Sequence, residues 1–307
     1  MAYPLTDTNP QIFRMSLAQH YADSTCAISF ELFPPKTDDG VRKLCEHVRR
    51  LLDFKPKFLT CTYGAGGSRQ DATLDVLDRV REISGLPVAS HLTCVGSTVD
   101  QLCDYLGQAQ QRGVEYIVAL RGDPPQGDTE FRQVEGGLRY ANDLVRLIRE
   151  RFPEFGIAVA GYPEVHQEAS DRQTDLDNLK RKVDAGADVV ITQLFYDNAD
   201  FYRFRDDCDR AGINVPIVPG ILPVTNFKQA RRIASMCKSK IPQRLEQAML
   251  ANEDADDQFR IGVDHAREQT IDLIDHQAAG IHYYVLNKSD AAIRLLDGLR
   301  MAAPAAS

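Results

Sequence analysis

Short apolar segments rich in β-branched residues alternate with longer amphipathic segments along the whole chain. An apolar run of about four to eight residues is typical of a buried strand, whereas apolar residues three or four positions apart are typical of a helix that packs on one face. The predicted strands are residues 27–33, 57–63, 88–94, 115–121, 156–162, 188–194, 214–221 and 281–287. The helical pattern is clearest in residues 40–54, 98–113, 138–152, 175–187 and 226–238.

Eight strand–helix units predict an α/β protein with a single-domain (β/α)8 TIM barrel. The alternative is an open doubly wound sheet, which would place a glycine-rich turn after the first strand, where this chain has Pro34-Pro35. Residues 225–280, between the seventh and eighth strands, are enough for two or three extra helices. The predicted boundaries are an N-terminal extension with a helix at 1–24, the barrel at 25–300 and a disordered tail at 301–307.

Composition narrows the class of partner. The chain has 307 residues, 43% of them hydrophobic and 26% charged, as in ordinary globular proteins. Its net charge of -8 argues against nucleic acid as the main partner. No apolar run approaches the ~20 residues of a membrane span, and the N-terminal sequence MAYPLTDTNPQIF lacks the features of a secretory signal. We therefore expect a cytoplasmic protein that binds neither nucleic acid nor membrane.

Cysteine and histidine spacing gives no indication of a metal site. The seven cysteines are scattered and include no CxxC pair, which predicts reduced thiols that act as small hydrophobic side chains. The seven histidines include no HExxH motif and no pair at metal-ligand spacing. The sequence therefore predicts no bound metal.

One carboxylate, Glu31, lies inside the apolar run FELFPPK. Successive side chains of a strand face opposite ways, so Glu31 cannot share a face with Phe30 or Leu32. An unpaired carboxylate would be costly if both faces were buried. Two interpretations remain open: an exposed edge strand, where Glu and Pro are tolerated, or an active-site acid at the end of a parallel strand.

Polar residues follow or end most of the predicted strands, where the active site of a (β/α)8 barrel lies. The positions are Glu31, Thr60, Thr62, Tyr63, His91, Thr93, Arg121, Asp123, Tyr162, Glu164, His166, Thr192 and Gln193. Several have an ordinary alternative: Thr62 as a strand former, His91 as a satisfied core histidine, and residues 180–182 as a solvated helix face instead of a phosphate contact. The segment GAGGS is either a flexible turn or a point of close ligand approach.

Some reaction classes are disfavoured by what is missing. The chain has no GxSxG motif, no evident nucleophile–base pair and no lysine at a strand end for a Schiff base. A general acid, amides, hydroxyls, aromatic rings and cations remain. This set suits a barrel in which an organic cofactor supplies the difficult chemical step.

Eight segments in register resemble the catalytic domain of the methylenetetrahydrofolate reductase family, bacterial type. They are FELFPPK, TCTYGAGGS, HLTC, IVALRGDPP, GYPEVHQEA, DLDNLKRKVDAGAD, ITQLFYD and PGILPVTNFKQA, across about residues 27–235, with a weaker YYVLNK. The resemblance implies an FAD-dependent (β/α)8 oxidoreductase of one-carbon metabolism and methionine synthesis. It would reduce 5,10-methylenetetrahydrofolate to 5-methyltetrahydrofolate with NADH or NADPH by a ping-pong mechanism. It also implies a homo-oligomer, without the S-adenosylmethionine-responsive domain of eukaryotic members.

The resemblance also assigns residues. It implies that Glu31 is the general acid and that Asp123 holds the pterin near the flavin. Folate contacts fall on Gln193, Gln229 and Lys288. The implied FAD contacts are Thr62, His91, Arg121, Gly122, Asp123, Tyr140, Ala141, Tyr162, His166, Asp175, Asn178, Arg181 and Lys182. One departure is Ile233, where an aromatic residue is expected near the nicotinamide and folate rings.

Two rival functions remain on the same fold. One is a cofactor-free barrel lyase or aldolase, because barrels host many chemistries. The other is a non-catalytic scaffold that binds flavin or folate. The sequence leaves the choice between NADH and NADPH open.

Overall fold

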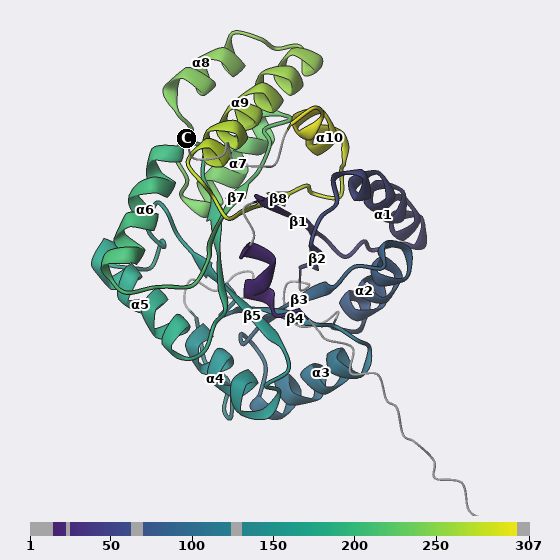
Figure 1. Ribbon diagram of the computed structural model, residues 1–307, viewed down its shortest axis with the longest axis vertical. Coiled ribbons are helices and arrows are strands. Elements are labelled where there is room, and N and C mark those ends of the chain that lie inside the picture. Colours follow the sequence, from purple (N-terminus) through teal and green to yellow (C-terminus); the bar gives the residue numbers. More distant parts are fainter. Residues whose placement is uncertain (1–14, 23–24, 63–69, 124–130, 300–307) are drawn as a thin grey trace, which may run out of the picture.

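The computed structural model describes residues 15–22, 25–62, 70–123 and 131–299. Eight parallel strands close into a barrel in chain order, and the last strand pairs with the first (Figure 1). The strands are β1 Ala27–Leu32, β2 Phe58–Cys61, β3 Val88–Thr93, β4 Tyr116–Leu120, β5 Gly156–Gly161, β6 Val189–Leu194, β7 Ile217–Ile221 and β8 Gly280–Tyr284. The prediction of a (β/α)8 barrel is confirmed, and the open-sheet alternative is wrong.

Alternation along β1 explains why a carboxylate can occur in this strand. Ile28, Phe30 and Leu32 are buried in the layer between the sheet and the surrounding helices. Ser29 and Glu31 therefore point to the inside of the barrel. Because β1 pairs with both β2 and β8, it is not an edge strand. Of the two interpretations of Glu31, the edge strand is wrong.

Two strand boundaries differ from the prediction by three residues, and the others differ by two or fewer. β7 begins at Ile217, three residues later than predicted, because Pro216 has no N–H to donate to a neighbouring strand. β8 ends at Tyr284, three residues earlier, because Leu286 and Asn287 take positive φ angles of 47° and 57° that no strand adopts. Tyr63, predicted to end the second strand, lies outside the described residues.

Ten α-helices of the described residues surround or extend the barrel (Figure 1). They are α1 Asp38–Leu51, α2 Gln70–Ser84, α3 Val99–Gln111, α4 Ala141–Arg151, α5 Arg172–Asp184, α6 Asn198–Arg210, α7 Phe227–Cys237, α8 Gln243–Leu250, α9 Ala255–Asp275 and α10 Asp290–Leu296. Side-chain caps fix several starts; Asn226, for example, accepts a hydrogen bond from the backbone of Gln229. α7, α8 and α9 confirm the predicted helices between the seventh and eighth strands.

A short 3-10 helix, η1 Leu17–Tyr21, closes the amino-terminal end of the barrel. Leu17 and Tyr21 pack with Phe58 and Tyr116, which come from the first residues of β2 and β4. Figure 1 shows η1 in the centre of the ring of strands. The functional site is therefore expected at the other end. The boundaries predicted inside residues 1–14 and the tail 301–307 lie outside the described residues.

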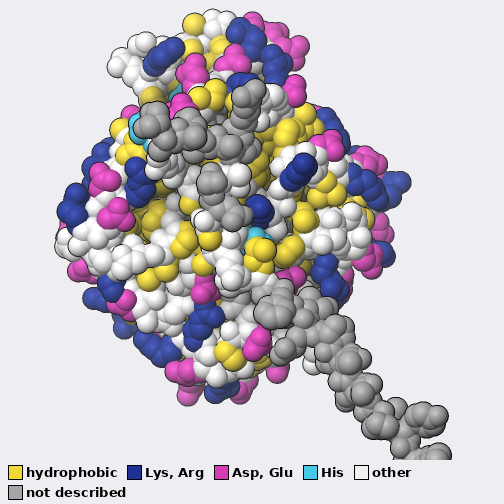
Figure 2. All heavy atoms as spheres, viewed as in Figure 1, with side chains coloured by type: hydrophobic (Ala, Val, Ile, Leu, Met, Phe, Trp, Pro, Cys, Tyr) yellow, Lys and Arg dark blue, Asp and Glu magenta, His cyan; other side chains and the backbone are white. Residues whose placement is uncertain are grey.

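Figure 2 shows the surface of one face of the molecule, seen from the same direction as in Figure 1. Charged side chains of both signs lie around the rim of this face, and hydrophobic side chains gather towards its centre. Within the described ranges, none of the helices combines the length and apolar character needed to cross a membrane.

Gly262 lets α9 lie directly against the chain that follows β7. A Cβ built on Gly262 would be 1.7 Å from the carbonyl oxygen of Val224. Gly262→Ala should therefore lower the free energy of unfolding by about 1–3 kcal/mol. Gly107→Ala is the matched control, because a Cβ at this position in α3 meets nothing within 4 Å. It should raise stability by up to about 1 kcal/mol. Urea unfolding measures both, and equal effects would contradict the close contact.

Candidate active site

Glu31 is the centre of a buried polar cluster at the carboxyl end of β1. Its side chain is 9% exposed, and its Oε2 lies 3.3 Å from Nε2 of His91 and 3.7 Å from Nε2 of His282. The other ring nitrogen of His282, Nδ1, lies 2.8 Å from Oγ of Ser29. These four residues, Glu31, His91, His282 and Ser29, are called the acid cluster below.

Barrel closure explains how the acid cluster forms. In the register between β1 and β8, Ser29 is opposite His282 and Glu31 is opposite Tyr284. Ser29 and Glu31 are two residues apart on β1, and His282 and Tyr284 are two residues apart on β8. The side chains of each pair therefore point to the same face of the sheet, the inside of the barrel. The Ser29 hydroxyl can donate to Nδ1 of His282, which leaves the proton on Nε2, facing Glu31. The arrangement therefore orients one imidazole towards the carboxyl group.

Electrostatics favour the neutral forms of His91 and Tyr284 near Glu31. Burial lowers the pKa of His91, and nearby His282 lowers it further, although Glu31 opposes the shift. His91 is therefore neutral at pH 7 and can act as an N–H donor to the carboxyl group. The pKa of Tyr284 is raised well above its usual value by burial and then by Glu31. Its hydroxyl stays protonated and donates to the Thr192 carbonyl at 2.7 Å.

Sequence reasoning missed His282, Ser29 and Tyr284. The strand 281–287 is predicted, but its own pattern does not show which of its side chains face those of the first strand. The signal was available: in a closed eight-stranded barrel the last strand lies beside the first, so the histidine of IHYYVLN must approach the inner face of FELF.

A second cluster, here called the cation cluster, joins the end of β5 to α5. It consists of Tyr162, His166, Asp175 and Lys182. The Tyr162 and His166 rings meet edge to face with centroids 4.5 Å apart, and Oδ2 of Asp175 accepts from the His166 backbone at 3.0 Å. Nζ of Lys182 donates to the Ala160 carbonyl at 2.5 Å and lies 5.7 Å from the centre of the Tyr162 ring.

Burial dominates the chemistry of this cluster. It lowers the pKa of Lys182 to about 8, against the opposing effect of Asp175. It also raises the pKa of Asp175 and lowers that of His166. A buried ammonium group whose hydrogen bond goes to a backbone carbonyl retains donor capacity for an electron-rich ligand.

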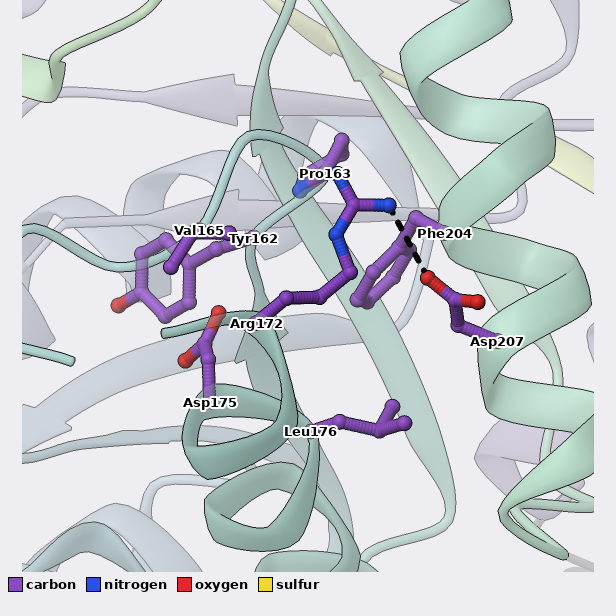
Figure 3. Close-up of a pocket in the computed structure, with 8 residues that line it drawn as sticks. All are labelled: Tyr162, Pro163, Val165, Arg172, Asp175, Leu176, Phe204 and Asp207. Carbon is purple, nitrogen blue, oxygen red and sulfur yellow. Dashed lines mark hydrogen bonds and ion pairs between the residues drawn. The ribbon is translucent and has the colours of Figure 1, made fainter. Parts of the chain in front are cut away.

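The loop that follows β5 and carries Tyr162 and His166 packs closely against α5 and α6 (Figure 3). The space between this loop and α6 is only about 10 Å³, about the size of one water molecule. Figure 3 shows Tyr162 and Asp175 on one side of it and Phe204 on the other, with Arg172 paired to Asp207 at 3.2 Å. Val165 has φ of 74°, a strained value for a β-branched residue. The packing therefore holds Tyr162 and Asp175 in a fixed position.

Arg121 and Gly122 follow β4 beside the cation cluster. The Arg121 guanidinium makes two hydrogen bonds to Glu168, of 2.5 and 2.6 Å, and lies 5.1 Å from the centre of the Phe131 ring. Gly122 has φ of +90°, and a Cβ there would be 2.4 Å from the Val95 side chain. Only glycine suits this position. Glu168, which fixes the orientation of Arg121, was not predicted from the sequence.

A family model described as methylenetetrahydrofolate reductase matches residues 16–300. The chain belongs to the methylenetetrahydrofolate reductase family. It is 43% identical over 284 residues to methylenetetrahydrofolate reductase (NADH) 1 of Arabidopsis thaliana, covering 89% of this chain and 48% of that protein. It is 42% identical over 264 residues to 5,10-methylenetetrahydrofolate reductase of Escherichia coli, covering 86% and 87%. The chain thus spans about half the length of the plant relatives, and the family resemblance is confirmed.

A solved structure shares the barrel. It is a protein from Clostridium thermocellum whose description states that it binds two copies of 5-methyl-5,6,7,8-tetrahydrofolic acid. The likeness has a TM-score of 0.65 at 16% sequence identity and covers 91% of this chain and 96% of that one. At this identity the likeness supports the fold alone.

Some residues assigned by the methylenetetrahydrofolate reductase resemblance lie at the strand ends. Asp123 is exposed, and its charge contributes to a raised pKa of both Tyr162 and Cys237, after the larger effect of burial. Thr62 is half-buried after β2 and donates its backbone N–H to Leu32. Gln193 is near the end of β6, with Oε1 bonded to the next backbone N–H. The segment GAGGS lies outside the described residues.

Other residues assigned by the methylenetetrahydrofolate reductase resemblance lie further out. Asn178 and Arg181 hydrogen-bond to each other on the exposed face of α5. Tyr140 and Ala141 begin α4, with Tyr140 47% exposed. Gln229 is exposed in the first turn of α7, and Lys288 follows β8. Within the described residues, the side chains of these six make no hydrogen bond to the side chains of the acid cluster or the cation cluster.

Proposed function

We propose that this chain reduces 5,10-methylenetetrahydrofolate to 5-methyltetrahydrofolate, with FAD as cofactor and NADH as reductant. The observation that carries the proposal is a buried carboxyl group, Glu31, at the carboxyl end of a barrel strand between two imidazoles. Membership of the family supports the substrate, and the names of the Arabidopsis and maize relatives support NADH over NADPH. Ping-pong kinetics, a cytoplasmic location and a homo-oligomer remain part of the proposal.

The cation cluster fits a flavin nucleotide. Lys182 is a half-buried cation whose hydrogen bond goes to a backbone carbonyl. Arg121 is also half-buried, and it follows β4, the strand that pairs with β5. Tyr162 offers an aromatic ring and a hydroxyl, and His166 a ring nitrogen. Such a set suits a large ligand with an aromatic ring system and negative charge. Bound flavin would supply the group that accepts a hydride from NADH and returns it to the folate.

The acid cluster would act on the folate. The carbon to be reduced is bridged between two nitrogens and resists hydride attack. The carboxyl O–H of Glu31 protonates one of these nitrogens, the C–N bond breaks, and the carbon becomes an electrophilic iminium on the other nitrogen. The hydride then forms the new C–H bond, and the product carries the methyl group.

His91 and His282 have a defined part in this step. Once Glu31 has lost its proton, a carboxylate remains in a buried site. The two Nε2–H groups can donate to it, which stabilises the charge as it forms. With the Ser29 hydroxyl as donor to Nδ1, the proton of His282 is on Nε2, where it can be donated to this carboxylate. We therefore assign Glu31 as the acid and His91, His282 and Ser29 as residues that position it.

The decisive experiment is an anaerobic titration of the purified protein. The protein should be yellow, NADH should bleach it, and 5,10-methylenetetrahydrofolate should restore the colour. NADPH in a parallel titration should act more slowly. A colourless protein with lyase or aldolase activity would contradict the proposal. A yellow protein that NADH does not bleach would also contradict it, and would indicate a binding scaffold.

A further inference from the structure

Thr60 lies inside the barrel, directly beside Glu31. Its neighbours Leu59 and Cys61 on β2 are buried in the layer between the sheet and the helices, so Thr60 faces the barrel interior. In the register of the sheet, Thr60 is opposite Glu31 on β1 and Ala89 on β3. Of these two neighbours, only Glu31 has a polar side chain. The polar group beside the Thr60 side chain in the register is therefore the Glu31 carboxyl group.

The hydroxyl of Thr60 is buried and unpaired. The residue is 0% exposed, and Oγ1 has no hydrogen-bond partner in the described part of the chain. The buried hydroxyls of Ser29 on β1 and Ser90 on β3 are paired, with His282 and Tyr105. A buried hydroxyl without a partner lowers stability, so this position would favour an apolar residue if packing were its only role. The unpaired hydroxyl therefore indicates a role in a state other than the free protein.

The charge on Glu31 changes during the proposed reaction. When the carboxyl group gives its proton to the folate, a carboxylate forms, and both of its oxygens accept hydrogen bonds. The imidazoles of His91 and His282 both approach Oε2, at 3.3 and 3.7 Å. Neighbouring strands are about 4.8 Å apart, so rotation about the Cα–Cβ bond of Thr60 can bring Oγ1 towards Oε1. Thr60 can thus supply a third donor, on the side of Oε1.

We propose that Thr60 is a positioning residue for the acid: its hydroxyl turns to donate a hydrogen bond to Glu31 as the carboxylate forms. The proposal rests on the proposed function. The proton that Glu31 loses goes to the folate nitrogen, and the electrons of the broken C–N bond remain on that nitrogen, while Thr60 keeps its own proton. Because the free protein lacks this hydrogen bond, its energy is gained only as charge develops. Such an interaction raises the rate of the chemical step instead of tightening the binding of substrate.

Thr60→Val tests the donor, because valine has nearly the shape of threonine without the hydroxyl. In the holoprotein, reduction by NADH should keep the wild-type rate, whereas transfer of the hydride to 5,10-methylenetetrahydrofolate should slow by about five- to fiftyfold. Thr60→Ser keeps a hydroxyl and should stay within about threefold of the wild type in both half-reactions. Stopped-flow absorbance measures the two half-reactions separately.

Glu31→Gln provides a second comparison, because its amide never becomes a carboxylate. In this background Thr60→Val should cause no further slowing of the folate half-reaction, so the two effects should not add. A further slowing of about fivefold or more would show that Thr60 acts independently of Glu31 and would contradict the proposal.

The apoprotein gives a measurement that does not depend on activity. Thr60→Val removes an unpaired buried hydroxyl, so the urea concentration at half-unfolding should rise. Thr270→Val is the matched control: Thr270 is also 0% exposed, but its Oγ1 lies 3.0 Å from the Tyr283 hydroxyl. Its loss should lower the urea midpoint and leave both half-reactions unchanged. A lower midpoint for Thr60→Val would show that the Thr60 hydroxyl is already paired in the free protein, which would overturn the proposal.

The outcomes separate this proposal from the proposed function. If the wild type completes both half-reactions and Thr60→Val completes them at the same rates, Thr60 has no role in proton transfer and the proposed function stands. Equal slowing of both half-reactions would indicate a general distortion of the barrel and would also count against a role for Thr60. If NADH does not bleach the wild type, or the folate does not restore its colour, the proposed function fails and the role of Thr60 fails with it.

Discussion

Glu31→Gln should still take a hydride from NADH at the native rate but should pass it to 5,10-methylenetetrahydrofolate about a hundred- to ten-thousandfold more slowly. The amide of glutamine has nearly the same shape as the carboxyl group, so the barrel should fold normally. It has no acidic proton, so the C–N bond of the methylene bridge cannot be opened by proton transfer. Reduction by NADH needs no such proton and is the internal control.

Stopped-flow absorbance separates the two half-reactions of Glu31→Gln. Rapid bleaching by NADH, followed by very slow recovery on addition of the folate, is the expected result. An intact folate half-reaction would show that Glu31 is not the acid. His282→Gln is a useful companion, because it keeps a side-chain amide near Glu31 and should slow only the same half-reaction, to a smaller extent.

Removal of the Lys182 ammonium group should have the second large effect. Lys182→Met keeps most of the apolar side chain but removes the ammonium group, and it should weaken FAD binding by about ten- to a hundredfold, as for loss of a charged hydrogen bond. Lys180→Met is the matched control: it lies on the same helix and pairs with Asp184 at the surface. Fluorescence titration of the apoprotein with FAD measures both. An unchanged affinity of Lys182→Met for FAD would show that this lysine does not bind the cofactor and has only a structural role.

The pH dependence of FAD binding should identify the same group. Lys182 in the free protein has a pKa of about 8, lowered by burial. A negatively charged or electron-rich ligand favours its protonated form. Above pH 8, binding then requires proton uptake, and Kd should rise by up to about tenfold per pH unit. Lys182→Met should lose this slope.

The stability of the apoprotein should change in the opposite direction. The folded-state pKa of Lys182 lies below the ordinary value of 10.5, so between about pH 8 and 10.5 the unfolded chain binds more protons than the folded chain. Over that window the contribution of Lys182 to the free energy of unfolding rises with pH. A lower affinity for FAD together with a higher free energy of unfolding of the apoprotein would therefore indicate Lys182. General alkaline unfolding would instead lower both the affinity and the free energy of unfolding.

The local pattern of the sequence was enough for the strands but not for all of their ends. The run that became β5 is continuous and apolar, and the run that became β1 is interrupted only by Ser29 and Glu31. The starts of both strands are predicted correctly. The end of β8 depends on Leu286 and Asn287, which adopt left-handed backbone angles in a segment that reads as a continuing strand. Such angles arise from tertiary contacts of the following loop, such as the hydrogen bonds between Asn287 and Phe33.

The candidate site could be predicted only in part for a similar reason. Glu31 stands out locally, because a carboxylate interrupts an apolar run. His282 does not, since a histidine in an aromatic strand is ordinary until β8 is placed beside β1. Glu168 is one of many acidic residues on the surface, and only the approach of Arg121 gives it a role. The roles of Glu31, Asp123 and the residues assigned to FAD remain predictions for the experiments above to test.

Closure of the barrel also sets the order in which the site can appear during synthesis. Ser29 and His282 are 253 residues apart in the chain, although their side chains touch. A ribosome releases the amino-terminal strands long before β8, so a nascent chain carries Glu31 and His91 without the imidazole of His282. The pairing of β1 with β8 is the most non-local contact of the sheet and has the highest loop-closure cost. Catalytic competence should therefore arise late in folding, as a property of the finished ring.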